Sequence, residues 1–492
     1  MAFIDSSAVN VALAALERSL HATVVDVQWV VESYGLFLGA LILTGGTLGD
    51  LLGRRRIFIA GTALFALASL ACGLAPNVPA LIVARSIQGV GAALLVPGSL
   101  AIVSTSFDEK SRGRAIGIWS GWTAIMTAVG PVLGGWLVEH ASWRWVFIIN
   151  LPLAAAVIAI SAWRIPESRS PAESRVDWVG ALLAAAGLGG LVFGLVESSS
   201  LGWADPLVRV SLVVACCSLG GFAVLERRVP FPMVPLALFR NATFTGANLL
   251  TLLLYAAVGI FFFLLPLNLI QVQGYSATAA GAGLLPVIVL MFLLSRWSGG
   301  LVARYGPARP LILGSMVVAL GFVLLALPSA KADYWRSFFP AVTVLGLGMA
   351  MTVAPLTTDV MNSVGEDRAG TASGVNNAVA RVAGVLGVAV LGIVLVSAFR
   401  TRLDRGLDSL RLSPKVVQAI QSQENRLAGL EIPAGLDAPV QAAVRGLVRD
   451  GFVSGFRIVM VLCAGLCGAS ALVAWRVIPD RGSIGPDGSG SG

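Results

Sequence analysis

Two acids and one arginine lie within long apolar stretches, where an ionised side chain is costly unless it serves a function. Asp5 is near the start of the chain, Glu32 lies in the second apolar stretch and Arg85 in the fourth. Burial disfavours the charged form of a carboxyl, so such an acid can hold a proton and release it when a cation or water approaches. We therefore expect Asp5 and Glu32 to bind protons; acids at helix ends are the alternative for both.

Arg85 shares one side of a predicted helix with an amide and with small residues. Arg85, Gln88, Gly89, Ala92 and Ala93 follow the spacing i, i+3, i+4, i+7, i+8, which places them on one helical face. The guanidinium then faces a narrow polar seam. A functional arginine is the favoured interpretation, and a buried packing arginine is the alternative.

The composition places these residues in a membrane protein. Of 492 residues, 57% are apolar and only 12% are charged, whereas roughly a quarter of a soluble protein is charged. The net charge of +8 is spread through apolar sequence, which excludes a disordered or nucleic-acid-binding chain. All five cysteines lie in apolar stretches, where we expect buried thiols, and there are only two histidines. We therefore expect no metal, no cofactor and no enzymatic activity.

Apolar segments of membrane-spanning length recur along the chain. About 20 residues form one spanning helix, and fourteen such segments can be counted, which predicts an all-α integral membrane protein. The segments are 1–16, 28–49, 57–75, 79–103, 114–138, 145–162, 177–197, 207–225, 244–270, 281–303, 310–328, 337–359, 370–398 and 452–476.

The distribution of lysine and arginine predicts the orientation. The loops after even-numbered segments, with the C-terminus, carry seventeen of these residues, against four in the opposite short loops. Cytoplasmic loops are the basic ones, so both termini are expected in the cytoplasm. The stretch 400–451 then lies outside the cell and has amphipathic patterning around Ile420 and Val444. We expect a small helical cap there, or alternatively a solvated loop on the membrane interface.

We make a separate prediction for each end of the chain. Only Met1 to Ile4 precede Asp5, so we expect the first span to lack several residues at its start. The closing Gly-Ser repeat has the composition of an artificial linker and is expected to lie outside the fold.

The loop between the second and third segments carries a specific motif. It reads Gly46-Thr-Leu-Gly-Asp50-Leu-Leu-Gly53-Arg54-Arg55-Arg56, with glycines for a tight turn, an acid near a helix end and arginines for the inner leaflet. A topogenic arginine run would explain only the arginines. The segment resembles the signature cytoplasmic loop of the major facilitator superfamily, in which it acts as a gate. Leu51 stands where a basic residue is common, so one arm of the family's charge network is absent or supplied elsewhere.

The second half echoes this loop. Gly299, Leu301, Gly306 and Arg309 follow Gly46, Leu48, Gly53 and Arg56 after 253 positions each. The resemblance implies the major facilitator fold, with an internal repeat of two six-helix bundles. We expect them at 1–162 and 244–476, with two linker helices and their loops at 163–243 and a tail at 477–492.

Three further segments resemble parts of the same superfamily. The Arg85 segment resembles its fourth-helix motif, whose arginine is associated with proton transfer. The fifth segment carries Gly117, Gly121, Gly130, Pro131, Gly134 and Gly135, which resembles the motif of its antiporters; plain helix packing is the alternative. Residues 4–13, including Asp5 and Asn10, resemble the first-helix signature of the fourteen-spanner drug:proton antiporters, the EmrB/QacA type.

A substrate cavity is expected, with residues from both halves of the chain. Aromatic walls with a few amides suit amphipathic or cationic organic molecules, although aromatic residues can equally face lipid. Arg381 is expected to face the interior for the same reason as Arg85. The expected cavity residues are Tyr34, Gln88, Trp122, Tyr255, Phe263, Asn268, Gln271, Asn377 and Arg381.

Together these features predict a proton-coupled exporter that works by alternating access. Its partners would be protons, membrane lipid and hydrophobic or cationic drug-like compounds, and we expect a monomer in the bacterial cytoplasmic membrane. The alternatives are an exporter of a native lipid or secondary metabolite, and a non-transporting scaffold or sensor that kept the fold.

Overall fold

The computed structural model of the chain is all-α in the part that it describes. It describes residues 1–106, 109–169, 177–230, 232–330, 332–364, 369–410, 412–432 and 436–479. The helices of the first half are α1 (Ala2–Leu20), α2 (Val24–Leu52), α3 (Arg54–Leu74), α4 (Val78–Ser106), α5 (Glu109–His140), α6 (Trp145–Ile148), α7 (Asn150–Arg164), α8 (Trp178–Leu201) and α9 (Pro206–Leu225).

The second half continues with a short 3₁₀ helix and ends with two long helices. Its elements are η1 (Leu236–Arg240), α10 (Ala242–Leu267), the π-turn η2 (Asn268–Val272), α11 (Ala277–Ala282), α12 (Leu285–Tyr305), α13 (Ala308–Leu325), the π-turn η3 (Tyr334–Phe338), α14 (Phe339–Asn362), α15 (Ala369–Ser409), α16 (Pro414–Gln421), η5 (Glu424–Gly429) and α17 (Ala438–Val477).

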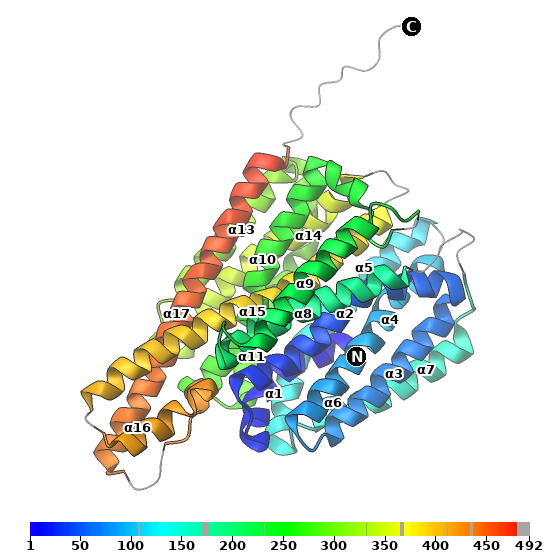
Figure 1. Cartoon of the computed structure of the whole chain (residues 1–492). Coiled ribbons are helices and arrows are strands. Elements are labelled where there is room, and N and C mark those ends of the chain that lie inside the picture. The colour runs from blue at the N-terminus through cyan, green and yellow to red at the C-terminus, as the bar shows by residue number, and fades with distance from the viewer. Residues whose placement is uncertain are drawn as a thin grey trace, which may run out of the picture.

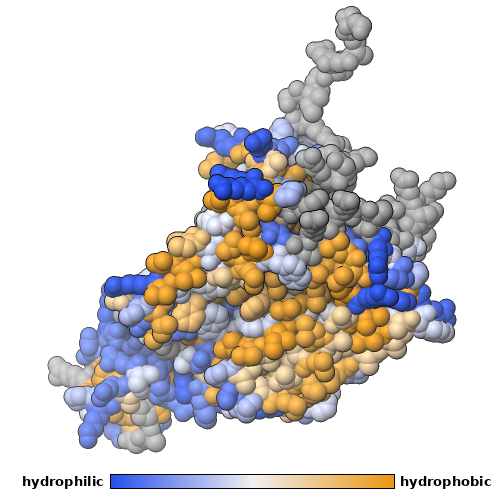
Figure 2. Space-filling model, turned by 45° about the vertical axis from the view of Figure 1, so that its right-hand side comes forward, coloured by the Kyte–Doolittle hydropathy of each residue, from blue (hydrophilic) through white to orange (hydrophobic). Residues whose placement is uncertain are grey.

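Twelve helices within the described residues are long and apolar enough to cross a membrane, two fewer than the fourteen predicted. The two predicted spans that do not qualify correspond to α1 and α5. The first contains Asp5, Glu17 and Arg18 within 19 residues, and parts of α5 lie outside the described side chains. The surface agrees with a membrane protein: Figure 2 shows a broad apolar belt, with hydrophilic residues gathered towards its two ends.

The helices form two groups that meet along their lengths (Figure 1). In the first group α2, α3 and α4 pack together, α1 lies against α5, and α3 against α7. In the second group α13 lies against α14 and α17, and α10 against α15 and α17. The groups contact each other where α2 meets α15 and where α5 meets α11 and α12. These contacts form the seams between the two groups.

The predicted tight turns lie at equivalent places in the two halves. Gly53 ends α2 with φ +115°, and Gly306, 253 positions later, ends α12 with φ +74°. Residues with a side chain rarely adopt positive φ, and glycine adopts it at little cost. The turn expected at Gly53 is therefore confirmed, and Gly306 adopts the same left-handed region at the corresponding position.

Helices α8 and α9 pack on each other, and α8 bridges the seam between α2 and α15. Helix α8 contacts both of those helices, and Trp29 Nε1 donates a hydrogen bond of 2.8 Å to Glu197 Oε1. Helix α9 packs mainly on α8, so most of its surface is exposed. Cys216 and Cys217, which we expected to be buried, are exposed on α9 for this reason.

The stretch 400–451 is more helical than the sequence suggested. Helix α15 continues to Ser409 and α17 begins at Ala438, so both extend past the predicted ends of their apolar segments. The amphipathic patterns form α16 and the first turns of α17, with Ile420 and Val444 fully buried. Figure 1 shows α16 and the adjoining helix ends projecting from one end of the molecule. We call this the outer end, because the lysine and arginine distribution predicts that it lies outside the cell.

Candidate functional site

Asp5 and Arg85 form an ion pair inside the first helix group. Arg85 Nη1 donates to Asp5 Oδ2 over 2.7 Å, and the exposed fractions of the two side chains are 1% and 0%. Helix α1 supplies the acid and α4 the arginine, 80 positions apart. The sequence singled out both residues but did not predict that they pair.

Two amides and a hydroxyl complete the surroundings of Asp5. Gln88 Nε2 and Asn150 Nδ2 each donate to Asp5 Oδ1 over 2.9 Å. The same two amides donate to Ser69 Oγ, over 2.8 and 2.9 Å respectively. Sequence analysis did not select Ser69 or Asn150 for this site. Asn150 opens α7, two positions before Pro152, and a polar residue at the start of an apolar helix is a signal that could have identified it.

Arg85 is held on its remaining sides by backbone and aromatic groups. Its Nε donates to the carbonyl of Val30 over 3.0 Å, and its Nη1 also donates to Gln88 Oε1 over 2.7 Å. The guanidinium carbon lies 4.2 Å from the ring centroid of Tyr34 and 5.8 Å from that of Phe147. A buried arginine so enclosed is positioned to respond to a change in the charge of Asp5.

Glu32 lies apart from this cluster, at the contact between the two groups. It is 1% exposed, and neither carboxyl oxygen has a hydrogen-bond partner within the described residues. Its neighbours along the same face of α2 lie against α15: Gly35 against Val385, and Gly39 against Arg381 and Val382. A buried acid without a partner is costly when ionised.

Arg381 approaches the first group from α15. Its guanidinium carbon lies 5.9 Å from the ring centroid of Phe3 on α1, and its charge acts on both Tyr34 and Tyr255. Arg381 therefore lies within electrostatic range of both tyrosines. Asn377, one turn before Arg381, is exposed.

The other predicted cavity residues lie elsewhere. Trp122 is 59% exposed and lies on the face of α5 that carries the exposed Trp136, about four turns further on. Phe263 is buried in an apolar core to which both groups contribute. Asn268 begins the π-turn η2, and Gln271 in that turn bonds to α1 at the outer end.

The predicted gate motif is bound by a residue that the sequence did not single out. Arg54 Nε donates to Asp50 Oδ1 over 2.8 Å, so these two residues of the motif pair with each other. Glu167 accepts from the backbone N–H groups of Arg55 and Arg56, over 3.1 and 3.2 Å, and its carboxylate also lies near both guanidinium groups. It thereby satisfies unpaired N–H groups at the start of α3. Gly46 faces Pro97 of α4.

The predicted antiporter motif lines two different contacts of α5. A Cβ at Gly130 would collide with Ser7 Oγ, and one at Gly134 would lie 2.8 Å from Ala8 Cβ, both on α1. Gly135 faces the backbone of Thr278, and the Pro131 carbonyl faces Gly281, both on α11 in the second group. The surroundings of Gly117 and Gly121 lie outside the described side chains. The described part of the stripe therefore allows close approach both within a group and between groups.

Two apolar pockets lie at the seams between the groups. One of about 550 Å³ is formed by α5 and α12, with Val129, Trp136 and Phe292 in its walls. The other, of about 420 Å³, lies among α2, α8, α9, α10 and α15, with Gly39, Phe222 and Val382 in its walls. Both groups of helices contribute to each pocket.

A membrane-spanning helical bundle in two halves, with charged residues buried within and between them, defines the secondary transporter class. The comparisons with known proteins agree. Residues 1–388 match the model of the Major Facilitator Superfamily. The chain therefore belongs to the Major Facilitator Superfamily and is an integral membrane protein.

Similar proteins cover almost the whole chain. The multidrug resistance protein Stp of Mycobacterium tuberculosis (strain CDC 1551 / Oshkosh) is 34% identical over 97% of this chain and 90% of its own. The tetracenomycin C resistance and export protein of Streptomyces glaucescens is 33% identical over 97% and 88%. A solved bacterial homologue of the human lysosomal transporter Spinster, in an inward-facing and unoccupied conformation, has a TM-score of 0.65 at 15% identity, covering 96% and 94%. This last likeness shows the shared fold.

Proposed function

We propose that the protein exports hydrophobic or cationic drug-like compounds in exchange for protons. The observation that carries the proposal is the Asp5–Arg85 ion pair, enclosed by Gln88, Asn150 and Ser69. A proton on Asp5 removes its negative charge, so the pair with Arg85 is weakened and the cluster must rearrange. The names of the relatives, which refer to multidrug resistance and antibiotic export, support the class of substrate.

The proposed cycle uses the two buried acids. In the outward-open state a proton reaches Asp5 or Glu32, the halves rock to open inward, and substrate displaces the proton. The proton gradient supplies about 1.4 kcal/mol per pH unit, and each charge moved adds about 2.3 kcal/mol per 100 mV. The cavity would be lined by Tyr34, Tyr255 and Arg381.

We also propose that the protein has fourteen spans, two more than the twelve helices that qualify. Helices α1 and α5 pack on each other within the first group, which supports counting them as spans alongside the twelve. The proposed arrangement is then fourteen spans of the drug:proton antiporter type, as bundles 1–162 and 244–476 with linker helices at 163–243. We propose a monomer in the bacterial cytoplasmic membrane with both termini in the cytoplasm.

Uptake into inverted membrane vesicles tests the coupling. A fluorescent cationic dye should accumulate when a proton gradient is imposed, and collapse of the gradient should abolish accumulation. Asp5→Asn and Glu32→Gln should each reduce uptake, and Trp122→Phe, on the exposed face of α5, serves as the control. Uptake that is independent of the gradient, or unchanged in both acid variants, would contradict proton coupling.

A second candidate function is export of a native secondary metabolite. It is favoured because a relative is named for resistance to, and export of, a single antibiotic, tetracenomycin C. Competition in the same vesicles separates the two: a broad set of dyes and drugs should compete with one another in a multidrug exporter, whereas a dedicated exporter should respond to one compound.

A further inference from the structure

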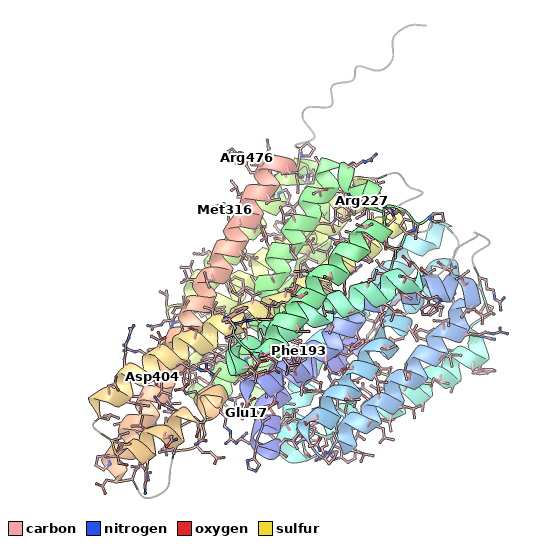
Figure 3. The ribbon with its side chains drawn as sticks, in the orientation of Figure 1. Glu17, Phe193, Arg227, Met316, Asp404 and Arg476 are labelled. Carbon is pink, nitrogen blue, oxygen red and sulfur yellow. The ribbon has the colours of Figure 1, made fainter. Side chains whose placement is uncertain are left out.

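Glu17 is a buried carboxylate outside the cluster around Asp5. It lies in the last turn of α1 and is 4% exposed. Gln271 Nε2, from η2 in the second half, donates to Glu17 Oε2 over 2.6 Å. Glu17 Oε1 is buried with no hydrogen-bond partner within the described residues. Figure 3 places Glu17 near the outer end, on the same side of the molecule as Asp404 and opposite Arg227 and Arg476.

The turn η5 covers this carboxyl. Gly429 lies directly over it: a Cβ built at Gly429 would lie 2.5 Å from Glu17 Oε1. Arg426 Nη2 donates to the carbonyl of His21 over 3.4 Å, and Leu427 is fully buried although its φ is +50°. The turn contacts α1 and α2 of the first half and η2, α15 and α17 of the second. The Glu17–Gln271 bond is therefore enclosed only when the halves meet.

Within the described residues Glu17 forms no ion pair with the charged groups around it. Arg18 Nε donates to Ala14 O, and Arg426 pairs with Glu431 over 3.6 Å; these are the two cations whose charges act on Glu17. Of the other ionisable groups near the outer end, Asp26 caps α2, Glu139 bonds to Thr278, His140 bonds to Trp136, and Arg144 bonds to the carbonyls of Gly73 and Ala75. Glu424 of η5 pairs with Arg400 over 3.2 Å, and His21, which caps α1, is exposed.

We propose that Glu17 binds a proton from the outer aqueous side and that this protonated form closes the outer end of the transporter. An ionised carboxylate with a single donor is costly to bury. A proton on Oε1 removes the charge, while Oε2 still accepts from Gln271. When the halves separate, water reaches the carboxyl and the proton returns to the outer side. Acid outside therefore favours the outer-closed state.

This inference rests on the proposed alternating-access function and adds a proton site to it. Glu17 differs from Asp5 and Glu32 because its proton is exchanged with one side only, so it sets when the outer end closes and not how many protons are moved.

Glu139 is a matched control at the same seam. Its Oε1 accepts from Thr278 N over 2.7 Å, so it also links the two halves, from α5 to α11. Its side chain is exposed, so closing the seam does not remove it from water. Glu139→Gln should not change the response to acid.

The experiment measures the distance between spin labels at exposed Ala141 and Ser329, one in each half at the outer end, in full-length protein in nanodiscs. The five cysteines are replaced by serine or alanine, and no substrate is present. From pH 8 to pH 5 the short-distance population should rise in the parent protein and in Glu139→Gln. In Glu17→Gln that rise should be lost, with the short distance dominant throughout; in Gln271→Ala the rise should shift to lower pH.

A pH response in Glu17→Gln equal to that of the parent would overturn the proposal. Loss of the response in Glu139→Gln to the same degree as in Glu17→Gln would also overturn it, because burial would then be irrelevant. The measurement involves no transport, so failure of proton-coupled uptake in vesicles would leave its outcome unchanged, and the two proposals can fail separately.

Discussion

Asp5 Oδ2 lies 2.7 Å from Arg85 Nη1, and neither side chain is exposed by more than 1%. The acid comes from the first helix and the arginine from the fourth. The two charges therefore depend on each other, because each would be isolated in an apolar interior without its partner.

Asp5→Asn should destabilise the protein markedly. It leaves the Arg85 charge unpaired, and removing one partner of a buried pair costs about 3–5 kcal/mol. Chemical unfolding in detergent micelles measures this change. Asp50→Asn is the control, since the Asp50–Arg54 pair is partly exposed and such pairs contribute about 0–1 kcal/mol. Equal losses of stability in the two variants would contradict this prediction, because breaking the buried pair should cost more than breaking the partly exposed one.

Asn150→Ala should weaken the site without removing a charge. It deletes one of the amides that donate to Asp5 Oδ1, and loss of a buried hydrogen-bond donor costs about 1–3 kcal/mol. The pH dependence of dye uptake should shift as well, because the ionised form of Asp5 loses a donor that stabilises it. A stability loss with an unchanged pH profile would assign Asn150 a purely structural role.

Gly134→Ala and Gly281→Ala should have different effects. A Cβ at Gly134 meets Ala8 within the first half, whereas one at Gly281 meets the Pro131 carbonyl in the other half. Gly134→Ala should lower stability by about 1–3 kcal/mol through overpacking. Gly281→Ala should instead lengthen the Ala141–Ser329 spin-label distance. Gly468→Ala, with nothing within 4 Å of the added Cβ, should do neither.

Glu167→Ala should destabilise the start of α3. The carboxylate accepts from the N–H groups of Arg55 and Arg56, and loss of a helix-capping side chain costs about 0.5–2 kcal/mol. Hydrogen exchange of α3 amides should rise in its first turn. Arg56→Ala, which removes only an exposed guanidinium, should leave that exchange unchanged; an equal rise in both variants would show that the ion pair, not the cap, is responsible.

The free energy of unfolding should fall as pH rises, because of the carboxyl group of Glu226. Glu226 follows the last residue of α9, outside the spanning segment. Burial raises the pKa of its carboxyl and the charge of Asp177 raises it further, while the N–H groups of Val234 and Met233 act in the opposite direction. A raised pKa means that the stabilising contribution is complete below the ordinary glutamate pKa and is lost as pH rises through the folded-state pKa.

Chemical unfolding at several pH values tests this. Glu226→Gln should remove the decline between acid and neutral pH, and Asp177→Asn, which keeps a capping side chain on α8, should reduce it. A wild-type curve that is flat over this range, or steeper in Asp177→Asn, would contradict the assignment.

The sequence by itself determined the class of protein and singled out Asp5, Glu32 and Arg85 as candidate functional charges. Apolar segments with few charges specify spanning helices, because backbone polar groups in lipid must bond within the helix. The motif with Gly53 predicted a tight turn, because positive φ at a helix end strongly favours glycine, and the structure has it. The repeat in the second half was also readable, since a local motif recurs at a fixed offset.

The tertiary structure decided which of these residues meet. Asp5 and Arg85 are 80 positions apart, and no helical periodicity relates positions on different helices. Ser69, Asn150, Glu167 and Glu17 were not selected from the sequence because a lone polar residue near a helix end is usual at a membrane surface. Trp122 fell on an exposed face because an aromatic residue satisfies lipid and cavity equally well. Whether a side chain is buried, and which partners it bonds to, depends on how the helices pack.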